Sequence, residues 1–340
     1  MTTARPGDQR SDGPALDRRI TLTLQGDWGQ ANLHRICGWL AQEVGDRCER
    51  GSEFFIRSGR GGADAIHAVL SGQVDVALMT PTAAMGMVGA GAGPLAVERA
   101  ERLRALGTLP QRDRLVTCVD AELGVASMEE LASQMPQLRI ATSPDDGVNL
   151  VGLAAHHQLR AVGIEPAALD AAGGSFVYDE RPFPAIAAFR DGDANVLIHE
   201  AIMMPAWQRI TDRKSVVYLD AAPSVIQAFD AWRWPTAIVP QGYLPGLERD
   251  LTALEFSDFL LLCTDALPDD IAALIAWCMV ATRDALEVQY RHIPPERSPL
   301  SYPLEPRAIA AAPIALHPAA AKAYAAFTED QRPTRALIWD

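Results

Sequence analysis

The chain has 340 residues and a formal net charge of −13 at pH 7, with 49% hydrophobic and 21% charged residues. This is an ordinary globular composition, long enough for one large hydrophobic core or two smaller ones. The negative balance argues against a nucleic-acid partner, because such surfaces gather basic residues, but it leaves room for an anionic ligand that needs only a few local donors.

Residues 1–19 read MTTARPGDQRSDGPALDRR and contain no apolar segment of the kind found in a secretion signal. We expect a disordered leader over residues 1–19 and, for the chain as written, a cytoplasmic protein. No stretch approaches the ~18 apolar residues of a membrane span, so no membrane insertion is expected. The five scattered cysteines indicate neither a disulfide framework nor a zinc site. We expect no cofactor and no metal. The sequence neither predicts nor excludes a homodimer.

The first predicted strand covers residues 20–24 (ITLTL) and leads into the loop QGDWGQAN and an amphipathic helix. In this loop, Asp27 can accept hydrogen bonds from a ligand and Trp28 can offer a flat apolar wall. The alternative is that Trp28 only anchors the loop.

The segment GRGG at residues 59–62 comes next, before a helix, a glycine and the strand ending at Met79. Arg60 can offer a bidentate contact to a carboxylate, and the backbone at Gly61 can approach a ligand closely. Thr80 follows the strand and should line the same cleft. The alternative for Arg60 is a solvated surface position.

The next predicted strand covers LRIAT, and it is followed by the loop SPDDGVN and then by a helix. We expect Ser143, Asp145 and Asn149 near a ligand, with backbone N–H groups at the helix start holding a carboxylate. The alternative is that Ser143 or Asp145 only caps the helix.

Residues 185–199 (AIAAFRDGDANVLIH) repeat a pattern found in residues 65–79 (AIHAVLSGQVDVALM) at a constant offset of 120. The pattern is a short helix, a glycine at its end and an apolar strand. In this alignment Asp75 lies opposite Asn195. His199 and Glu200 then end a strand at the position of Met79 and Thr80. Adjacent strand residues point to opposite faces, so we expect only one of this pair in the cleft.

Trp232-Arg233-Trp234-Pro235 combines aromatic and basic side chains. Arg233 or Trp234 can close over a bound solute, or the indoles can pack between lobes. No dinucleotide or P-loop fingerprint is present.

The repeated strand–helix units predict an α/β fold with two doubly wound lobes joined by a hinge. Residues 20–118 and 235–340 are expected to form lobe 1, and residues 119–234 lobe 2. The two hinge crossings are placed near residues 116–120 and between residues 218 and 234. Ligands in such sheets bind beyond the carboxyl ends of the strands, so the loops of both lobes should meet in one cleft.

In chain order, the first strand and its loop, GRGG with AIHAVLSGQVDVALM, LVTCVDAELGVASMEELA, LRIATSPDDG, DGDANVLIHEAIMMPAW and IALHPAAAKAYAA resemble a known family. The family is the TAXI solute receptors of TRAP transporters, which have the periplasmic-binding-protein type II fold. The resemblance covers most of residues 20–327 and implies a clamshell receptor. Receptors of this family carry a secretion signal, which this chain as written lacks.

The sequence and the family resemblance support two hypotheses about function and leave a third class of protein open. The first is binding of a small organic carboxylate with hinge closure and no chemistry, as the resemblance implies. The second is a cytoplasmic decarboxylase or lyase on the same fold, with His199 as the catalytic residue. A sensory module is the third. The motif order favours the binding protein.

Overall fold

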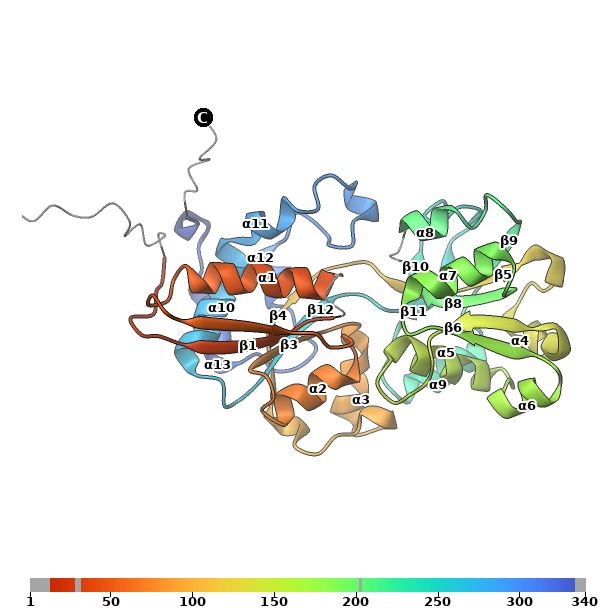
Figure 1. Cartoon of the computed structure of the whole chain (residues 1–340), viewed down its shortest axis with the longest axis horizontal. Helices are drawn as coiled ribbons and strands as arrows, with labels where there is room; N and C mark the ends of the chain where they lie inside the picture. Colours follow the sequence, from red (N-terminus) through yellow and green to blue (C-terminus); the bar gives the residue numbers. More distant parts are fainter. Residues whose placement is uncertain (1–12, 28–31, 202–203, 334–340) are drawn as a thin grey trace, which may run out of the picture.

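The computed structural model describes residues 13–27, 32–201 and 204–333, which form two α/β lobes side by side (Figure 1). Lobe 1 has a five-stranded sheet in the order β2-β1-β3-β12-β4. Its strands are β1 (Thr21–Gln25), β2 (Glu53–Arg57), β3 (Val76–Met79), β4 (Leu103–Leu109) and β12 (Phe259–Thr264). Its helices are α1 (Asn32–Gly45), α2 (Ala63–Leu70), α3 (Met85–Ala90), α10 (Asp269–Ala281), α11 (Arg283–Glu287), α12 (Pro306–Ala310) and α13 (Pro318–Ala326).

Lobe 2 has a seven-stranded sheet in the order β10-β11-β5-β8-β6-β7, with β9 also paired to β5. Its strands are β5 (Arg114–Asp120), β6 (Arg139–Thr142), β7 (Ser175–Tyr178), β8 (Val196–Glu200), β9 (Val216–Leu219), β10 (Thr236–Val239) and β11 (Leu251–Glu255). Its helices are α4 (Met128–Leu131), α5 (Leu150–Ala161), α6 (Pro166–Ala171), α7 (Pro182–Asp191), α8 (Met204–Gln208) and α9 (Pro223–Asp230).

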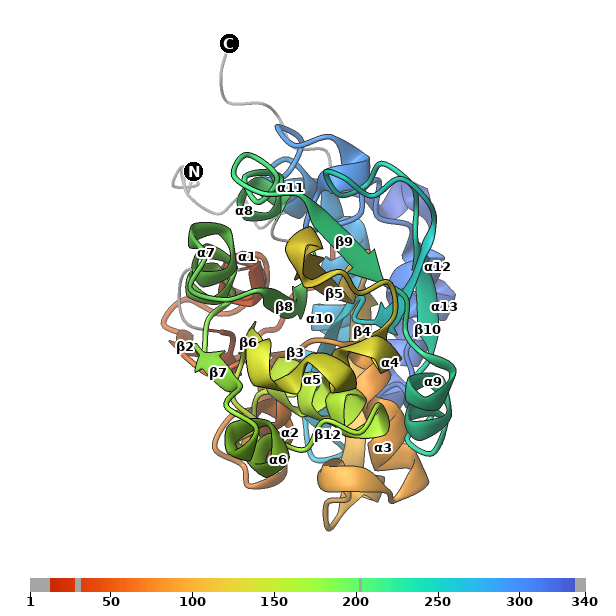
Figure 2. The same ribbon diagram turned by 90° about the vertical axis from the view of Figure 1, so that its right-hand side faces the viewer.

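Helices cover both faces of each sheet, so the central strands are apolar on both sides. In β3, Leu78 packs in the cluster formed with α1 and α10, while Ala77 and Met79 pack in the cluster that contains α2. In lobe 2, α7 and α8 lie on one side of the sheet and α5 and α9 on the other (Figure 2). This two-sided burial confirms the predicted α/β class with two doubly wound lobes.

The two lobes repeat one another in detail. In lobe 1, β3 is parallel to β1, and in lobe 2, β8 is parallel to β6; both β3 and β8 have an antiparallel neighbour on their other side. Asp75 accepts the backbone N–H of Thr23 at 2.7 Å, and Asn195 accepts that of Arg139 at 2.8 Å. The two residues aligned by the 120-residue offset therefore make the same bond in each lobe.

The lobes are in contact in this structure. The backbone N–H of Ala63, at the start of α2, donates to the carbonyl of Val148 in lobe 2 at 3.1 Å. A Cβ at the neighbouring Gly62 would overlap that carbonyl oxygen. The clamshell is thus closed, and glycine is needed where the two backbones meet.

The chain crosses between the lobes at residues 110–113 and 256–258, so the expected lobe limits at 118/119 and 234/235 need correction. β5 lies entirely in lobe 2, where it pairs with β8, β9 and β11. β10 and β11 also belong to lobe 2, since β10 pairs with β11 and β11 pairs with β5. A strand forms its whole ladder within one sheet, so the expected limit inside β5 is wrong. The crossing segments are the short polar links before β5 and after β11.

The expected disordered leader is also too long, because residues 13–19 pack on lobe 1. The Leu16 N–H donates to the Arg47 carbonyl at 2.7 Å, and Arg18 makes two 2.9 Å hydrogen bonds to Asp270. The five cysteines form no disulfide with one another, and four of them are buried. Within the described residues, no helix is long and apolar enough to span a membrane.

Candidate functional site

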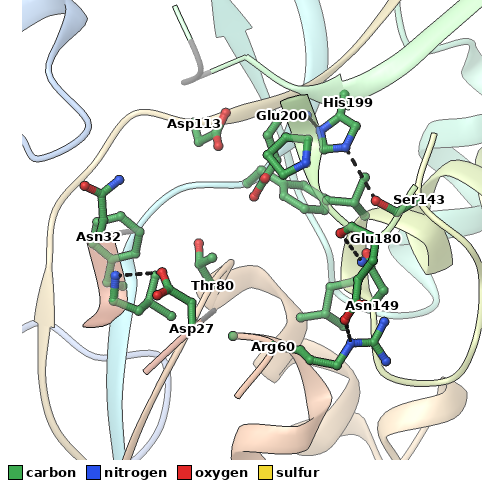
Figure 3. Close-up of a pocket in the computed structure, with 18 of the residues that line it drawn as sticks. Asp27, Asn32, Arg60, Thr80, Asp113, Ser143, Asn149, Glu180, His199 and Glu200 are labelled. Atoms are coloured by element: carbon green, nitrogen blue, oxygen red, sulfur yellow. Dashed lines mark hydrogen bonds and ion pairs between the residues drawn. The ribbon is translucent and has the colours of Figure 1, made fainter. Parts of the chain in front are cut away.

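A cleft between the lobes collects polar side chains from both lobes and from both crossing segments (Figure 3). The space in it that a water-sized molecule can reach is about 60 Å³. The cleft is lined by Asp27, Asn32, Leu33, Arg60, Gly61, Gly62, Thr80, Gln111, Asp113, Ser143, Asn149, Leu150, Val151, Glu180, Pro182, His199, Glu200, Phe256 and Phe259.

Arg60 lines the cleft as predicted, but its guanidinium is already paired with lobe 2. Nη2 lies 2.6 Å from Asp146 Oδ2, and Nε pairs with Glu180. The loop that carries Arg60 is held by Asp64, whose carboxylate accepts the N–H groups of Arg60 and Gly62 at 2.8 and 3.1 Å. Arg60 therefore joins the lobes across the rim of the cleft.

Gly61 and Thr80 line the cleft together. Gly61 adopts a φ of +71°, which favours glycine. Its carbonyl accepts the N–H of Thr80 at 3.0 Å, and the Thr80 hydroxyl lies 3.4 Å from the Gln111 amide nitrogen. Both lie where the sequence placed them, at the carboxyl end of the lobe 1 sheet.

The start of α5 is the corresponding edge of lobe 2. Asn149 caps the helix, accepting the Gly152 N–H at 3.0 Å, while Asp146 accepts the N–H groups of Val148 and Asn149 at 3.0 Å each. Burial raises the pKa of Asp146, but these bonds and Arg60 together hold it below its usual range. Asp145 points elsewhere, since its carboxylate pairs with Arg160 at 3.2 Å.

Two donors at the same helix start have no acceptor among the described residues. They are the backbone N–H groups of Leu150 and Val151, in the first turn of the twelve-residue α5. Ser143 also lines the cleft and is 1% exposed. Helix N-termini stabilise negative charge, so this corner of the cleft suits an acceptor group of a ligand.

His199 is a neutral side chain in this cleft. Its Nδ1 accepts the N–H of Glu200 at 2.9 Å, which leaves the proton on Nε2, 3.4 Å from the Ser143 hydroxyl. Burial lowers the pKa of His199 to about 3. His199 is thus a fixed donor to Ser143, and the proton of the Ser143 hydroxyl is left to point at a ligand.

Glu200 also enters the cleft, so the expectation that only one of the two residues does so is wrong. β8 ends at Glu200, and beyond the end of a strand the side chains of both faces can reach the same space. Figure 3 shows its carboxyl group turned toward Asp113 and Thr80. Burial, and then the charge of Asp27, raise the pKa of Glu200 to about 7.

Asp27 lines the cleft, whereas the predicted residues Asp145, Arg233 and Trp234 do not. The carboxylate of Asp27 accepts the N–H groups of Leu33 and His34 at 3.0 and 3.2 Å, at the start of α1. Trp28 lies outside the described residues. Arg233 lines a separate surface groove, and Trp234 is buried in the core with its Nε1–H bonded to the Glu255 carbonyl at 2.7 Å. Both lie next to the second crossing segment, because Arg233 shares its groove with Ser257 and Asp258 and the Trp234 ring lies 5.3 Å from that of Phe256.

Several lining residues carry no sequence signal of their own. Gln111, Asp113 and Phe256 lie in the two crossing segments, and their place in the cleft depends on where the chain leaves each sheet. Asp113 accepts the N–H groups of Arg114 and Ala201 at 2.7 and 2.9 Å. Glu180 follows β7 and was the one residue that strand-end logic could have found.

Comparison with known proteins shows the fold. No protein-family model and no curated protein matches the chain. A solved structure described as a periplasmic transporter has a TM-score of 0.50 and 13% identity, covering 83% of this chain and 88% of that chain. A TctC solute-binding protein from Polaromonas has a TM-score of 0.44 and 14% identity, covering 84% and 91%. MatC from Rhodopseudomonas palustris with bound malate has a TM-score of 0.44 and 15% identity, covering 76% and 82%. The chain has the type II fold of periplasmic binding proteins, and the narrower TAXI resemblance stays a prediction.

Proposed function

We propose that this protein binds a small organic solute between its lobes and holds it by hinge closure without chemical change, like the TAXI-type receptors its sequence resembles. The observation that carries the proposal is the enclosed cleft, which draws polar side chains from both lobes and both crossing segments. Such convergence is the usual mark of a ligand site in two-lobed proteins. Its volume restricts the solute to a small molecule.

The solute carries a carboxylate that binds at the start of α5. The donors for it are the N–H groups of Leu150 and Val151 and the hydroxyl of Ser143, which His199 orients. Arg60 is not its anchor, because that guanidinium already contacts two carboxylates. The helix dipole and three donors favour an anionic oxygen at this corner even though the chain is acidic overall.

A decarboxylase or lyase that uses His199 is the weaker alternative. General acid–base catalysis works best with a group whose pKa lies near the working pH. Burial holds the pKa of His199 at about 3, so its imidazole stays neutral throughout the physiological range. Its two nitrogens are also both engaged, one by the backbone and one by Ser143.

The test begins with mass spectrometry of small molecules released from natively purified protein. Each released compound is then titrated back by calorimetry into the stripped protein, its Ser143→Ala variant and the control Ser175→Ala. Ser175 is an exposed residue of the edge strand β7. Loss of one charge-assisted hydrogen bond weakens binding about tenfold to a hundredfold. We expect that loss in Ser143→Ala alone, with the compound recovered unchanged in mass.

Two results would overturn the proposal. If no compound is released and none of a set of three- to six-carbon acids raises the melting temperature, the cleft does not bind such solutes. If the bound compound is converted over many turnovers, the protein is an enzyme.

A further inference from the structure

The cleft carries far more negative than positive charge. Four carboxyl groups line it, those of Asp27, Asp113, Glu180 and Glu200, against the single guanidinium of Arg60. Arg60 lies at the rim and pairs with Glu180 and with Asp146 outside the lining. The charge of Arg60 is therefore neutralised by carboxylates at the lobe contact, and the inner part of the cleft remains acidic.

The inner carboxyl groups differ in how they are satisfied. Asp27 receives two backbone N–H groups at the start of α1, and Asp113 receives two at the crossing segment. The Glu200 carboxylate, by contrast, makes no hydrogen bond or ion pair with the residues that the structure describes. Glu200 is half-buried, and its carboxyl group faces the cleft, so the cleft presents an acceptor that a donor of the ligand can fill.

We infer, resting on the solute-binding function proposed above, that the ligand carries a protonated nitrogen and that Glu200 is the specificity-determining residue that accepts its N–H. Asp27 and Asp113 supply the surrounding negative potential, and the Thr80 hydroxyl is a further acceptor on the same side of the cleft (Figure 3). The carboxylate corner at α5 then receives the other end of a small zwitterion.

Two further observations support an organic cation with a separate anionic end. Ser143, 1% exposed, lies 3.4 Å from His199 Nε2 near the start of α5, whereas the Glu200 carboxyl group is turned toward Asp113 and Thr80, so the donor end and the acceptor end of the cleft are separate. Among residues 13–27, 32–201 and 204–333, no three His, Cys, Asp or Glu side chains are arranged to hold a metal ion. The acidic side therefore suits an ammonium group better than a divalent cation.

The experiment uses three probes that share a three-carbon chain, β-alanine, n-propylammonium and propionate, titrated by calorimetry into the stripped full-length protein. The variants are Glu200→Gln, which keeps the shape and removes the charge, and the control Glu248→Gln at an exposed position of lobe 2. We expect β-alanine to bind most tightly. Glu200→Gln should weaken β-alanine and n-propylammonium about tenfold to a hundredfold while leaving propionate unchanged or tighter.

A second readout needs only the unsubstituted protein. A cation that binds beside Glu200 displaces the proton that this carboxyl group partly holds near pH 7, so binding of β-alanine at pH 7 should release protons. The measured enthalpy will then depend on the ionisation enthalpy of the buffer. This dependence should vanish in Glu200→Gln and persist in Glu248→Gln.

The results separate this inference from the function on which it rests. If propionate binds as tightly as β-alanine and Glu200→Gln alters neither, or if the solute released from native protein has no basic nitrogen, the inference is wrong and solute binding stands. If neither a probe nor a released solute binds, both are wrong.

Discussion

Arg60 Nη2 of lobe 1 lies 2.6 Å from Asp146 Oδ2 of lobe 2, and this pair spans the rim of the cleft. Asp146 in turn accepts the N–H groups of Val148 and Asn149, just before α5. Closure of the lobes is thereby coupled to the backbone that presents the carboxylate corner. We therefore expect Arg60 to affect ligand affinity by positioning this loop and not by contacting the ligand.

Replacement of Arg60 by alanine should favour the open form. The two ion pairs are about one-quarter to one-half exposed, so together they contribute roughly 1–2 kcal/mol to closure. We expect a larger radius of gyration of the ligand-free variant in small-angle X-ray scattering, and affinity for the released solute about five- to thirtyfold weaker. Arg233→Ala, in a separate groove, should change neither. An Arg60→Ala protein as compact as the parent would contradict this role.

Gly62→Ala should block closure by sterics alone. A methyl group at this position would overlap the carbonyl oxygen of Val148 across the lobe contact. Each lobe should keep its fold, so the melting temperature should fall by only a few degrees while solute affinity falls at least tenfold. Gly89→Ala in α3 is the matched control, because nothing lies near its added methyl group. Unchanged affinity in Gly62→Ala would mean that ligands bind an open form.

The internal repeat predicted most of the fold. The rule that ligand-facing residues follow the carboxyl ends of buried strands predicted about half of the residues that line the cleft. The 120-residue offset located two equivalent helix–glycine–strand units, and Asp75 and Asn195 occupy the same structural position. Side chains just after buried strands, such as Thr80, Ser143 and Glu200, were found because parallel strands deliver their ends to one edge.

What the sequence could not predict depends on contacts between distant segments. The partners of Arg60 lie 86 and 120 positions away, and nothing local distinguishes a guanidinium that binds a ligand from one that binds the opposite lobe. Asp113 was missed because the first crossing was placed inside β5, whose apolar pattern resembles any buried strand. Arg233 and Trp234 were misread for the same reason at the second crossing.

Glu200→Gln should stabilise the ligand-free protein at high pH. The pKa of Glu200 is about 7 when folded, above its ordinary value of 4.5, so its contribution to stability is present below pH 4.5 and is lost as the pH rises through 7. Above pH 7 the charged carboxylate costs up to about 3 kcal/mol, which the amide avoids. Melting curves at pH 5 and pH 8 should show the variant gaining several degrees only at pH 8. Equal gains at both pH values would exclude this cause. The charged and titratable groups facing Glu200 across the cleft are those of Asp27, Arg60, Asp113, Glu180 and His199.

His199 should impose the opposite pH dependence. Its folded pKa of about 3 is below the ordinary value of 6.5, so its contribution to stability is present above pH 6.5 and is lost as the pH falls toward 3. At pH 5 the cost of keeping the imidazole neutral is about 2 kcal/mol. In His199→Gln this loss disappears, so its melting temperature should depend less on pH between 5 and 7.5 than that of the parent. His67→Gln, at an exposed position of α2, should keep the parent's pH dependence.

The same variant also decides between a binding and a catalytic role for His199. Glutamine can place an amide donor near the position of Nε2 and so continue to orient the Ser143 hydroxyl, whereas His199→Leu cannot. We therefore expect solute affinity to stay within a few fold in His199→Gln and to fall about five- to tenfold in His199→Leu, with the solute recovered unchanged from both variants and from the parent. A proton-transfer role would require a rate of conversion in the parent that drops 10²–10⁴-fold in both variants alike, because neither side chain can exchange a proton. Conversion of that size, measured by the mass of the solute after incubation with stoichiometric protein, would replace the binding function with a lyase.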